Sequence, residues 1–139
     1  MEIYFPEQDD IIEDPIIAFC KCWYGLENWD GVTTRWMGKN GALFVYSRGN
    51  NYCDLSIRSM SFMRPRYLEI TKDRAPAARF LVPTTLSDMK TPIKLREGIN
   101  LIEFNLPEGC EKPSDSNPDS VADDRCLGLA FQEIKISNI

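Results

Sequence analysis

The sequence of 139 residues contains no histidine. Imidazole is the side chain that most often acts as a general base near neutral pH, and it is the commonest metal ligand. Its absence excludes Ser-His-Asp and Cys-His catalytic sites and histidine-rich metal centres from this chain. We therefore predict that the chain is not an enzyme.

Long hydrophobic runs and basic clusters are also missing. No apolar stretch approaches the roughly 20 residues that a membrane-spanning helix needs. Sixteen Lys and Arg stand against 21 Asp and Glu, which gives a net charge of -5. Because phosphate contacts need a basic surface, the composition argues against nucleic acid as a partner. We expect a chain with no membrane span of its own.

The five cysteines are odd in number, so they do not form a complete disulfide framework. Cys20 and Cys22 are too close for a zinc knuckle and suit two small apolar side chains on one strand face. Cys53 lies in an alternating strand and is expected in the core. Cys110 and Cys126 flank a loop rich in Pro, Ser and Asp. In an oxidising compartment, a disulfide between them would add roughly 3 kcal/mol to the free energy of unfolding. The bridged and free states of this pair both remain open.

Short segments with alternating apolar and polar residues dominate the chain after residue 40. Cys53, Leu55 and Ile57 share one face of the clearest segment, and Leu101 points away from the face of Ile102 and Phe104. A shift in the alternation predicts a β-bulge near Gln132 and Glu133. Turn residues recur every 8 to 12 positions, as in sandwiches and jelly rolls. The predicted strands cover residues 16–20, 42–47, 52–62, 66–71, 78–82, 93–95, 99–106 and 127–136.

The predicted fold class is therefore all-β, a jelly-roll-like β-sandwich of about eight antiparallel strands. Residues 1–15 are predicted to be a flexible or loosely docked lead-in, and residues 16–139 a single β-sandwich domain. A short helix near Thr84–Lys90 or in the lead-in is an open alternative.

All three tryptophans lie between Trp23 and Met37. A sugar ring has a CH-rich face that stacks on aromatic rings, and its hydroxyls need carboxylate, amide or guanidinium partners. The candidate carbohydrate-binding residues are Trp23, Tyr24, Glu27, Trp29, Arg35, Trp36, Asp124 and Arg125. The alternative for Trp23 and Trp36 is burial in the core, which we favour. Trp29, between Asn28 and Asp30, is the tryptophan that we expect to be exposed.

The charged residues of this set have structural alternatives too. Glu27 and Arg35 are expected to pair with each other as a structural clamp, or else to contact a ligand. Arg125 is expected either to bridge back to Glu27 or to face a ligand. Glu27 and Asp124 would be the carboxylates of a glycoside hydrolase, a remote alternative because acidic pairs arise easily by chance in this composition.

No cofactor and no metal ligand set is predicted. Calcium at a structural site is the one exception that we keep, because Asp115, Asp119, Asp123 and Asp124 lie in one long loop. Their spacing does not match an EF-hand, and an acidic loop is more often simply solvated.

Several short motifs follow one another along the chain in an order that occurs in other proteins. They are Trp23-Tyr24-Gly25-Leu26-Glu27, Arg35-Trp36-Met37, Leu43-Phe44-Val45, Arg64 to Ile70, Leu95 to Asn100 and Asp123 to Gly128. With these motifs, residues 23–139 resemble the jelly-roll, carbohydrate-binding-module-like β-sandwich domains attached to archaeal and bacterial membrane or surface proteins of glycan processing. The resemblance implies a non-catalytic domain outside the cytoplasm, in agreement with a Cys110–Cys126 bridge.

The leading hypothesis is a non-catalytic module that binds carbohydrate or serves as an accessory to a glycan-processing protein. Its partner would be a glycan or another domain of a larger protein, and its location extracytoplasmic, as part of a membrane-anchored or surface protein. The alternative is a structural or protein-interaction domain whose aromatic residues are buried. The exposure of Trp29 and its neighbours distinguishes the two.

Overall fold

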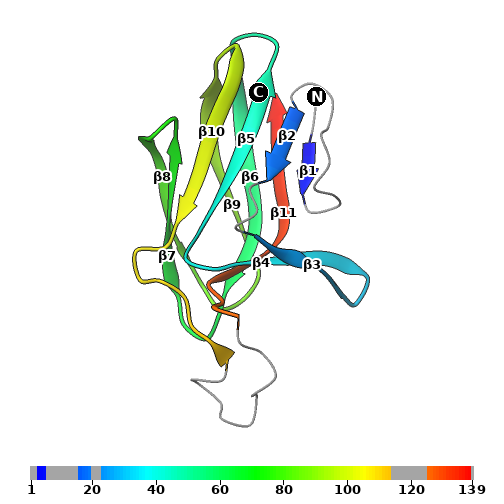
Figure 1. The fold of residues 1–139 in the computed structure, drawn as a ribbon, viewed down its shortest axis with the longest axis vertical. Coiled ribbons are helices and arrows are strands. Elements are labelled where there is room, and N and C mark those ends of the chain that lie inside the picture. Colours follow the sequence, from blue (N-terminus) through cyan, green and yellow to red (C-terminus); the bar gives the residue numbers. More distant parts are fainter. Residues whose placement is uncertain (1–2, 6–15, 20–22, 114–124, 139) are drawn as a thin grey trace.

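The computed structural model describes residues 3–5, 16–19, 23–113 and 125–138. Its strands form two antiparallel sheets packed face to face (Figure 1). One sheet has the order β3-β4-β11-β6-β9, with β1 paired to β11, and the other has the order β2-β5-β10-β7-β8. The predicted all-β sandwich is confirmed.

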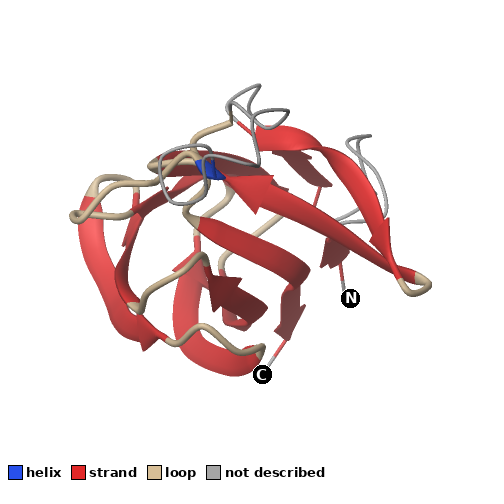
Figure 2. Cartoon of the chain, turned by 90° about the horizontal axis from the view of Figure 1, so that it is seen from below, coloured by secondary structure: helices blue, strands red, loops and turns tan. Residues whose placement is uncertain are grey.

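The six-stranded sheet contains β1 (Ile3–Phe5), β3 (Trp23–Trp29), β4 (Val32–Met37), β6 (Asn51–Ser61), β9 (Ser87–Leu95) and β11 (Leu129–Asn138). The five-stranded sheet contains β2 (Ile16–Phe19), β5 (Asn40–Ser47), β7 (Arg66–Lys72), β8 (Ala75–Val82) and β10 (Gly98–Asn105). Figure 2 shows the two layers from below.

Strand alternation builds the core between the sheets. Cys53, Leu55 and Ile57 are buried as predicted, and Ile102 and Phe104 face them from β10. Every second residue of a strand points to the same face, so one apolar row per strand is enough to close the sandwich. The expected bulge is also confirmed, because the register of β11 against β6 shifts between Phe131 and Glu133.

Three elements differ from the sequence expectation. The stretch from Trp23 to Met37 forms the β3–β4 hairpin, which we did not predict and which extends to one side of the sandwich (Figure 1). Residues 87–90 belong to β9, so the suggested helix in that region does not form. Ile3–Phe5 of the lead-in pairs with β11, whereas residues 6–15 lie outside the described residues and the division at residue 15 stays a prediction.

Candidate functional site

The β3–β4 hairpin turns at Asp30 and Gly31. Both residues have positive φ, 52° and 87°, which is the backbone of a tight type I′ hairpin turn. The amide of Gly31 donates to Asn28 Oδ1 over 2.8 Å and closes the turn. An Asp-Gly pair between alternating residues is a strong hairpin signal, so this element was accessible from the sequence.

The register of the hairpin sorts its side chains onto two faces. Glu27 pairs with Thr34, and Trp29 pairs with Val32. Glu27, Trp29 and Trp36 therefore point to the outer side of the six-stranded sheet. The rings of Trp29 and Trp36 contact each other with centroids 5.7 Å apart.

Glu27 is the centre of the polar contacts on this face. Its Oε2 accepts from Arg125 Nη1 at 2.7 Å, and its Oε1 accepts from Trp29 Nε1 at 3.3 Å. Arg125 also lies over the ring of Tyr24, 5.7 Å from its centroid. We call Tyr24, Glu27, Trp29, Trp36 and Arg125 the hairpin cluster.

The predicted bridge from Arg125 to Glu27 is therefore present. The predicted Glu27–Arg35 pair is not formed, because Arg35 lies opposite Leu26 in the register and points to the other face of the hairpin. Arg35 is buried at 3% exposure on the side of Met37. A long cationic side chain at that position does not reach the outer surface.

Trp23 does not join the cluster either. It packs edge-on against Phe104 and Phe131, with centroid distances of 5.9 Å and 5.4 Å. Its Nε1 donates to the carbonyl of Ala42 at 3.1 Å. The ring of Trp23 is enclosed between the sheets and offers no face to a ligand. This agrees with the favoured alternative, burial of Trp23 in the core.

Trp36 is also buried, at 6% exposure, and packs edge-on against Phe62. Trp29 and Tyr24 are half-buried against the same small apolar cluster. The predicted platform of three tryptophans is thus reduced to the partly exposed rings of Trp29 and Tyr24. Trp29 is less exposed than expected because the ring of Trp36 packs against it and covers part of its surface.

A disulfide joins Cys110 and Cys126, with Cα atoms 5.3 Å apart. Next to it, the backbones of Glu111 and Leu127 exchange two hydrogen bonds of 2.9 Å and 2.7 Å. The amide of Cys126 donates to Tyr24 Oη at 3.1 Å. The covalent link and these hydrogen bonds hold Arg125 next to the hairpin.

Arg66, the largest fully buried side chain, anchors the same loop. Its Nη2 donates to Glu111 Oε1 at 2.9 Å, and its Nη1 donates to Ser61 Oγ at 3.0 Å. Burial lowers the pKa of this guanidinium, while the charge of Glu111 opposes the shift. A buried cation of this kind needs its anionic partner. The Arg66–Glu111 pair therefore holds the backbone next to Cys110 in place.

Asp124 and the acidic loop proposed for calcium lie outside the described residues. Within the described part of the chain, no group of three or more Cys, Asp or Glu side chains is arranged to hold a metal ion. The described residues also include no helix with the length and apolar character needed to cross a membrane.

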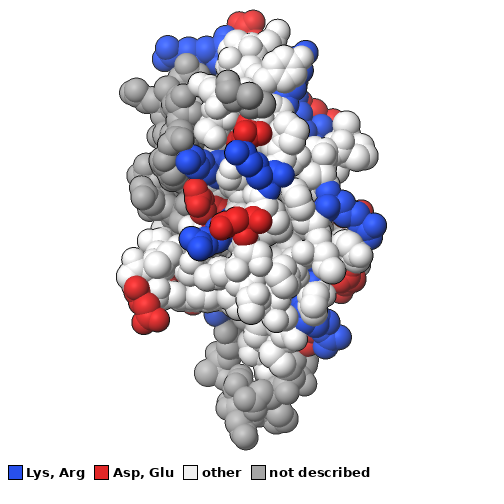
Figure 3. Space-filling model, turned by 180° about the vertical axis from the view of Figure 1, so that it is seen from behind, with Lys and Arg blue, Asp and Glu red and all other residues white. Residues whose placement is uncertain are grey.

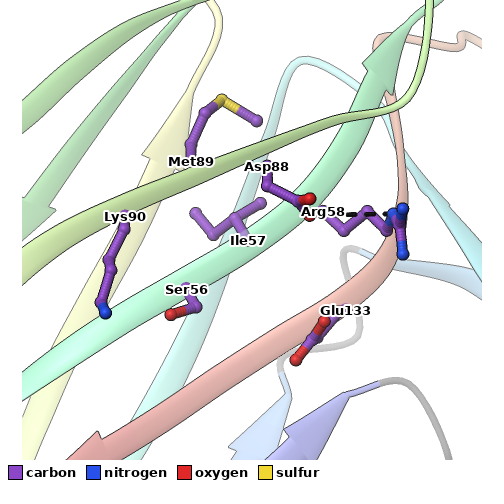
Figure 4. Close-up of a pocket in the computed structure, with 7 residues that line it drawn as sticks. All are labelled: Ser56, Ile57, Arg58, Asp88, Met89, Lys90 and Glu133. Atoms are coloured by element: carbon purple, nitrogen blue, oxygen red, sulfur yellow. Dashed lines mark ion pairs between the residues drawn. The ribbon is translucent and has the colours of Figure 1, made fainter.

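The outer face of the six-stranded sheet carries a shallow hollow of about 360 Å³ over β6, β9 and β11 (Figure 4). Arg58 and Asp88 form an ion pair of 3.7 Å at its edge. Lys90 pairs with Asp54 at 3.4 Å. Seen from this side of the molecule, acidic and basic side chains are intermixed (Figure 3), and they neutralise one another.

A second surface, to which the sequence analysis assigned no role, lies on the outer face of the five-stranded sheet. Phe44, Tyr46 and Ile99 are exposed there, next to a hollow of about 360 Å³ over β5, β10 and β7. The signal in the sequence is that β5 has apolar residues on both faces, where a half-buried strand alternates with polar ones.

By sequence, neither a protein-family model nor a curated protein matches the chain. Several solved structures share its fold. The family 35 carbohydrate-binding module (CBM35) from Cellvibrio japonicus Abf62 superposes with a TM-score of 0.62 at 12% identity, over 99% of this chain and 94% of that one. A family 35 module from Clostridium thermocellum gives 0.56 at 15% identity, over 100% and 99%.

The fold also occurs as part of longer proteins. The Podospora anserina GH26-CBM35 β-(1,4)-mannanase matches with a TM-score of 0.55 at 13% identity over 99% of this chain. This chain spans only 28% of the length of that enzyme. The β-sandwich described here therefore has the fold of family 35 carbohydrate-binding modules, one of which is part of a mannanase.

Proposed function

We propose that the chain is a non-catalytic carbohydrate-binding module that serves as an accessory to a glycan-processing protein outside the cytoplasm. Its fold is that of the modules described above, one of which is part of a mannanase. The disulfide between Cys110 and Cys126 suits an oxidising compartment. Attachment to a membrane-anchored or surface protein is part of the same proposal.

The observation that carries the proposal is the hairpin cluster. Trp29 and Tyr24 present partly exposed aromatic rings on either side of the Glu27–Arg125 ion pair. Aromatic rings accept the CH face of a sugar, and a fixed carboxylate and guanidinium offer an acceptor and several donors to its hydroxyls. Contacts within the cluster hold these groups in place before a ligand arrives, which reduces the entropy cost of binding.

Hydrolysis is not part of the proposal. A glycosidase places two carboxyl groups on either side of the bond that it cleaves. Both oxygens of Glu27 are already engaged, by Arg125 at 2.7 Å and by Trp29 at 3.3 Å. The second candidate, a protein-interaction domain, is favoured by the burial of Trp23 and Trp36.

A tryptophan-fluorescence titration tests the proposal. The full chain is titrated with β-(1,4)-mannan oligosaccharides, laminarin and cello-oligosaccharides, and affinities are measured in parallel by calorimetry. We expect a saturable emission change with at least one glycan, because Trp29 is the partly exposed indole. Trp29→Ala should abolish the emission change, and Trp29→Phe should keep most of the affinity because it keeps a ring.

Far-UV circular dichroism and urea unfolding verify that both variants fold. If no glycan binds the chain but another domain of a larger protein does, the protein-interaction function replaces the proposed one. Equal affinities in the wild type and in a folded Trp29→Ala variant would remove the hairpin cluster from the binding site.

A further inference from the structure

The last strands of the two sheets leave a hollow between them at one side of the sandwich. β9 ends the six-stranded sheet and β8 ends the five-stranded sheet, on the side opposite the β3–β4 hairpin (Figure 1). The hollow has a volume of about 260 Å³, and we call it the edge cleft. Its lining residues are Lys72, Ala75, Pro76, Ala77, Pro92, Ile93, Lys94 and Arg96.

The edge cleft is basic, although the chain as a whole is acidic. Lys72, Lys94 and Arg96 line it, and none of the described residues that line it is acidic. The adjoining turn between β7 and β8 adds Asp73 and Arg74. The lining and its turn thus carry four cations and one carboxylate, in a sequence whose net charge is -5. A local charge of this sign attracts an anionic partner.

Asp73 positions two of these cations but leaves them with free donors. Its Oδ1 accepts from the amide of Leu101 at 2.9 Å, which fixes the carboxylate. Its Oδ2 contacts Lys72 Nζ at 3.0 Å and Arg96 Nε at 3.2 Å. An ammonium has three N–H donors and a guanidinium has five, so both can bind a further anion. Among the residues that the structure describes, no carboxylate forms an ion pair with Lys94.

Arg74 adds its charge at a cost in backbone strain. Asp73 and Arg74 have φ of 50° and 68°, as a two-residue hairpin turn requires. Glycine adopts such angles without strain, whereas a residue with a Cβ does not. No hydrogen bond or ion pair joins the Arg74 side chain to any part of the chain that the structure describes. Strained residues without a structural partner are typical of binding sites.

Two prolines determine how a partner can use this edge of the sandwich. Pro76 lies in β8 and Pro92 lies in β9. Because proline has no backbone N–H, it blocks the addition of a further strand to an edge. The same prolines give the edge cleft apolar walls, to which Ile93, 5% exposed, adds a third apolar side chain. The cleft therefore suits inserted side chains rather than a paired strand.

The size and chemistry of the edge cleft select among anionic partners. Its volume of about 260 Å³ lies below the roughly 300 to 1,000 Å³ of pockets that enclose a free small molecule. Nucleic acid needs a basic stripe along the surface, which a single cleft does not provide. An acidic protein segment matches both parts of the lining, because its carboxylates bind the cations and its apolar side chains pack on the prolines.

We propose that the edge cleft is a docking site for an acidic segment of a partner protein that also carries apolar side chains. In the accessory role proposed above, this contact orients the module relative to its partner. The inference goes beyond glycan binding and does not depend on it, because the edge cleft and the hairpin cluster have no residue in common.

Calorimetry of the full chain with a synthetic acidic peptide tests the proposal. The probe is an acetylated hexapeptide of alternating Glu and Leu, and the comparison peptide has Gln in place of Glu. We expect the Glu peptide to bind saturably and the Gln peptide not to bind, because the cations need a carboxylate partner. Raising the salt concentration from about 50 mM to about 500 mM should weaken binding about tenfold.

Three variants locate the binding site. Lys94→Ala should weaken binding of the Glu peptide about fivefold, since it removes a cation without a carboxylate partner. Arg74→Gly should also weaken binding, yet raise the midpoint of thermal unfolding, because glycine relieves the strain. Lys90→Ala is the matched control, because Lys90 lies on β9 outside the cleft. In spectra of the wild type, amide signals of β8 and β9 should shift on binding.

Losses in Lys94→Ala and Arg74→Gly that Lys90→Ala does not show support the docking site. An equal loss in Lys90→Ala, equal binding of the Gln peptide, or no binding of the Glu peptide at about 1 mM would overturn it. Tighter binding of a polyuronate that Lys94→Ala weakens would make the occupant a polysaccharide, and a dimer that Lys94→Ala dissociates would make it a second copy. Both outcomes overturn the proposal, and neither affects the glycan titration with Trp29→Ala.

Discussion

At the scale of single residues, Glu111 forms ion pairs with two arginines that differ in burial. The side chain of Arg66 is 2% exposed and that of Arg64 is 66% exposed, yet both contact Oε1 of Glu111. Removing a buried member of an ion pair leaves its partner desolvated, whereas an exposed pair contributes little. The pair therefore offers an internal comparison of buried and exposed charge.

We expect Arg66→Ala to lower the free energy of unfolding by about 3 kcal/mol, because Glu111 and Ser61 lose a buried donor. Arg64→Ala should cost less than about 1 kcal/mol. Urea unfolding monitored by circular dichroism measures both. Equal losses in the two variants would contradict the assignment of Arg66 as the anchor of the disulfide loop.

At the same scale, the burial of Trp23 that the sequence analysis favoured is confirmed, whereas its neighbours Tyr24 and Glu27 are partly exposed. Trp23 is inside because β3 lies at the edge of a sheet whose inner face meets Phe104 from the other layer. A contact between residues so distant along the chain has no local signature.

At the scale of elements, the β7–β8 turn is tied to β10 by one carboxylate. Asp73 and Arg74 both have positive φ, 50° and 68°, which is strained for residues with a Cβ. Asp73 Oδ1 accepts from the amide of Leu101 at 2.9 Å, and Oδ2 contacts Lys72 and Arg96 at 3.0 Å and 3.2 Å. These contacts secure a turn that the backbone alone would not favour.

Burial opposes ionisation of Asp73, but the hydrogen bond from Leu101 and the cations Lys72 and Arg96 outweigh it and lower the pKa. A pKa that is lower in the folded state stabilises the fold above the unfolded value of about 3.9, and the gain is lost as the pH falls through the folded value. We expect Asp73→Asn to cost about 1 kcal/mol at pH 7 and to flatten the decline of stability below about pH 4.

Urea unfolding at pH 7, 5, 4 and 3 measures the effect. Asp88→Asn is the control, because the side chain of Asp88 is 74% exposed and its ion pair is long. A decline with falling pH as steep in Asp73→Asn as in the wild type would show that other carboxylates carry the acid sensitivity.

At the scale of the whole molecule, the sequence has a net charge of -5, and ion pairs such as Arg58–Asp88 and Lys90–Asp54 balance charges on the outer face of the six-stranded sheet. Binding of a neutral glycan through ring stacking and hydrogen bonds involves no counterion release. We expect its affinity to change less than about twofold between 50 mM and 500 mM salt, since screening acts on charges. Calorimetry at the two salt concentrations measures it, and a tenfold loss would point to an anionic ligand.

The sequence by itself determined the local features of this protein. Alternation identified the inward rows of β6 and β10, and a break in that alternation located the bulge before Glu133. The absence of histidine excludes side-chain imidazole chemistry from this chain. These properties need only neighbouring residues, because a strand has a period of two and a turn has its own residue chemistry.

Only the tertiary structure decided which strands lie side by side and which of their side chains come into contact. It placed Arg125 on Glu27, turned Arg35 away from both, and enclosed Trp23 between the sheets. It also brought Phe44 and Tyr46 of β5 beside Leu101 and Ile99 of β10, with Glu103 next to them on one open face. The order of strands in a sheet depends on contacts between distant segments, and a shift of one residue in register would exchange the two faces.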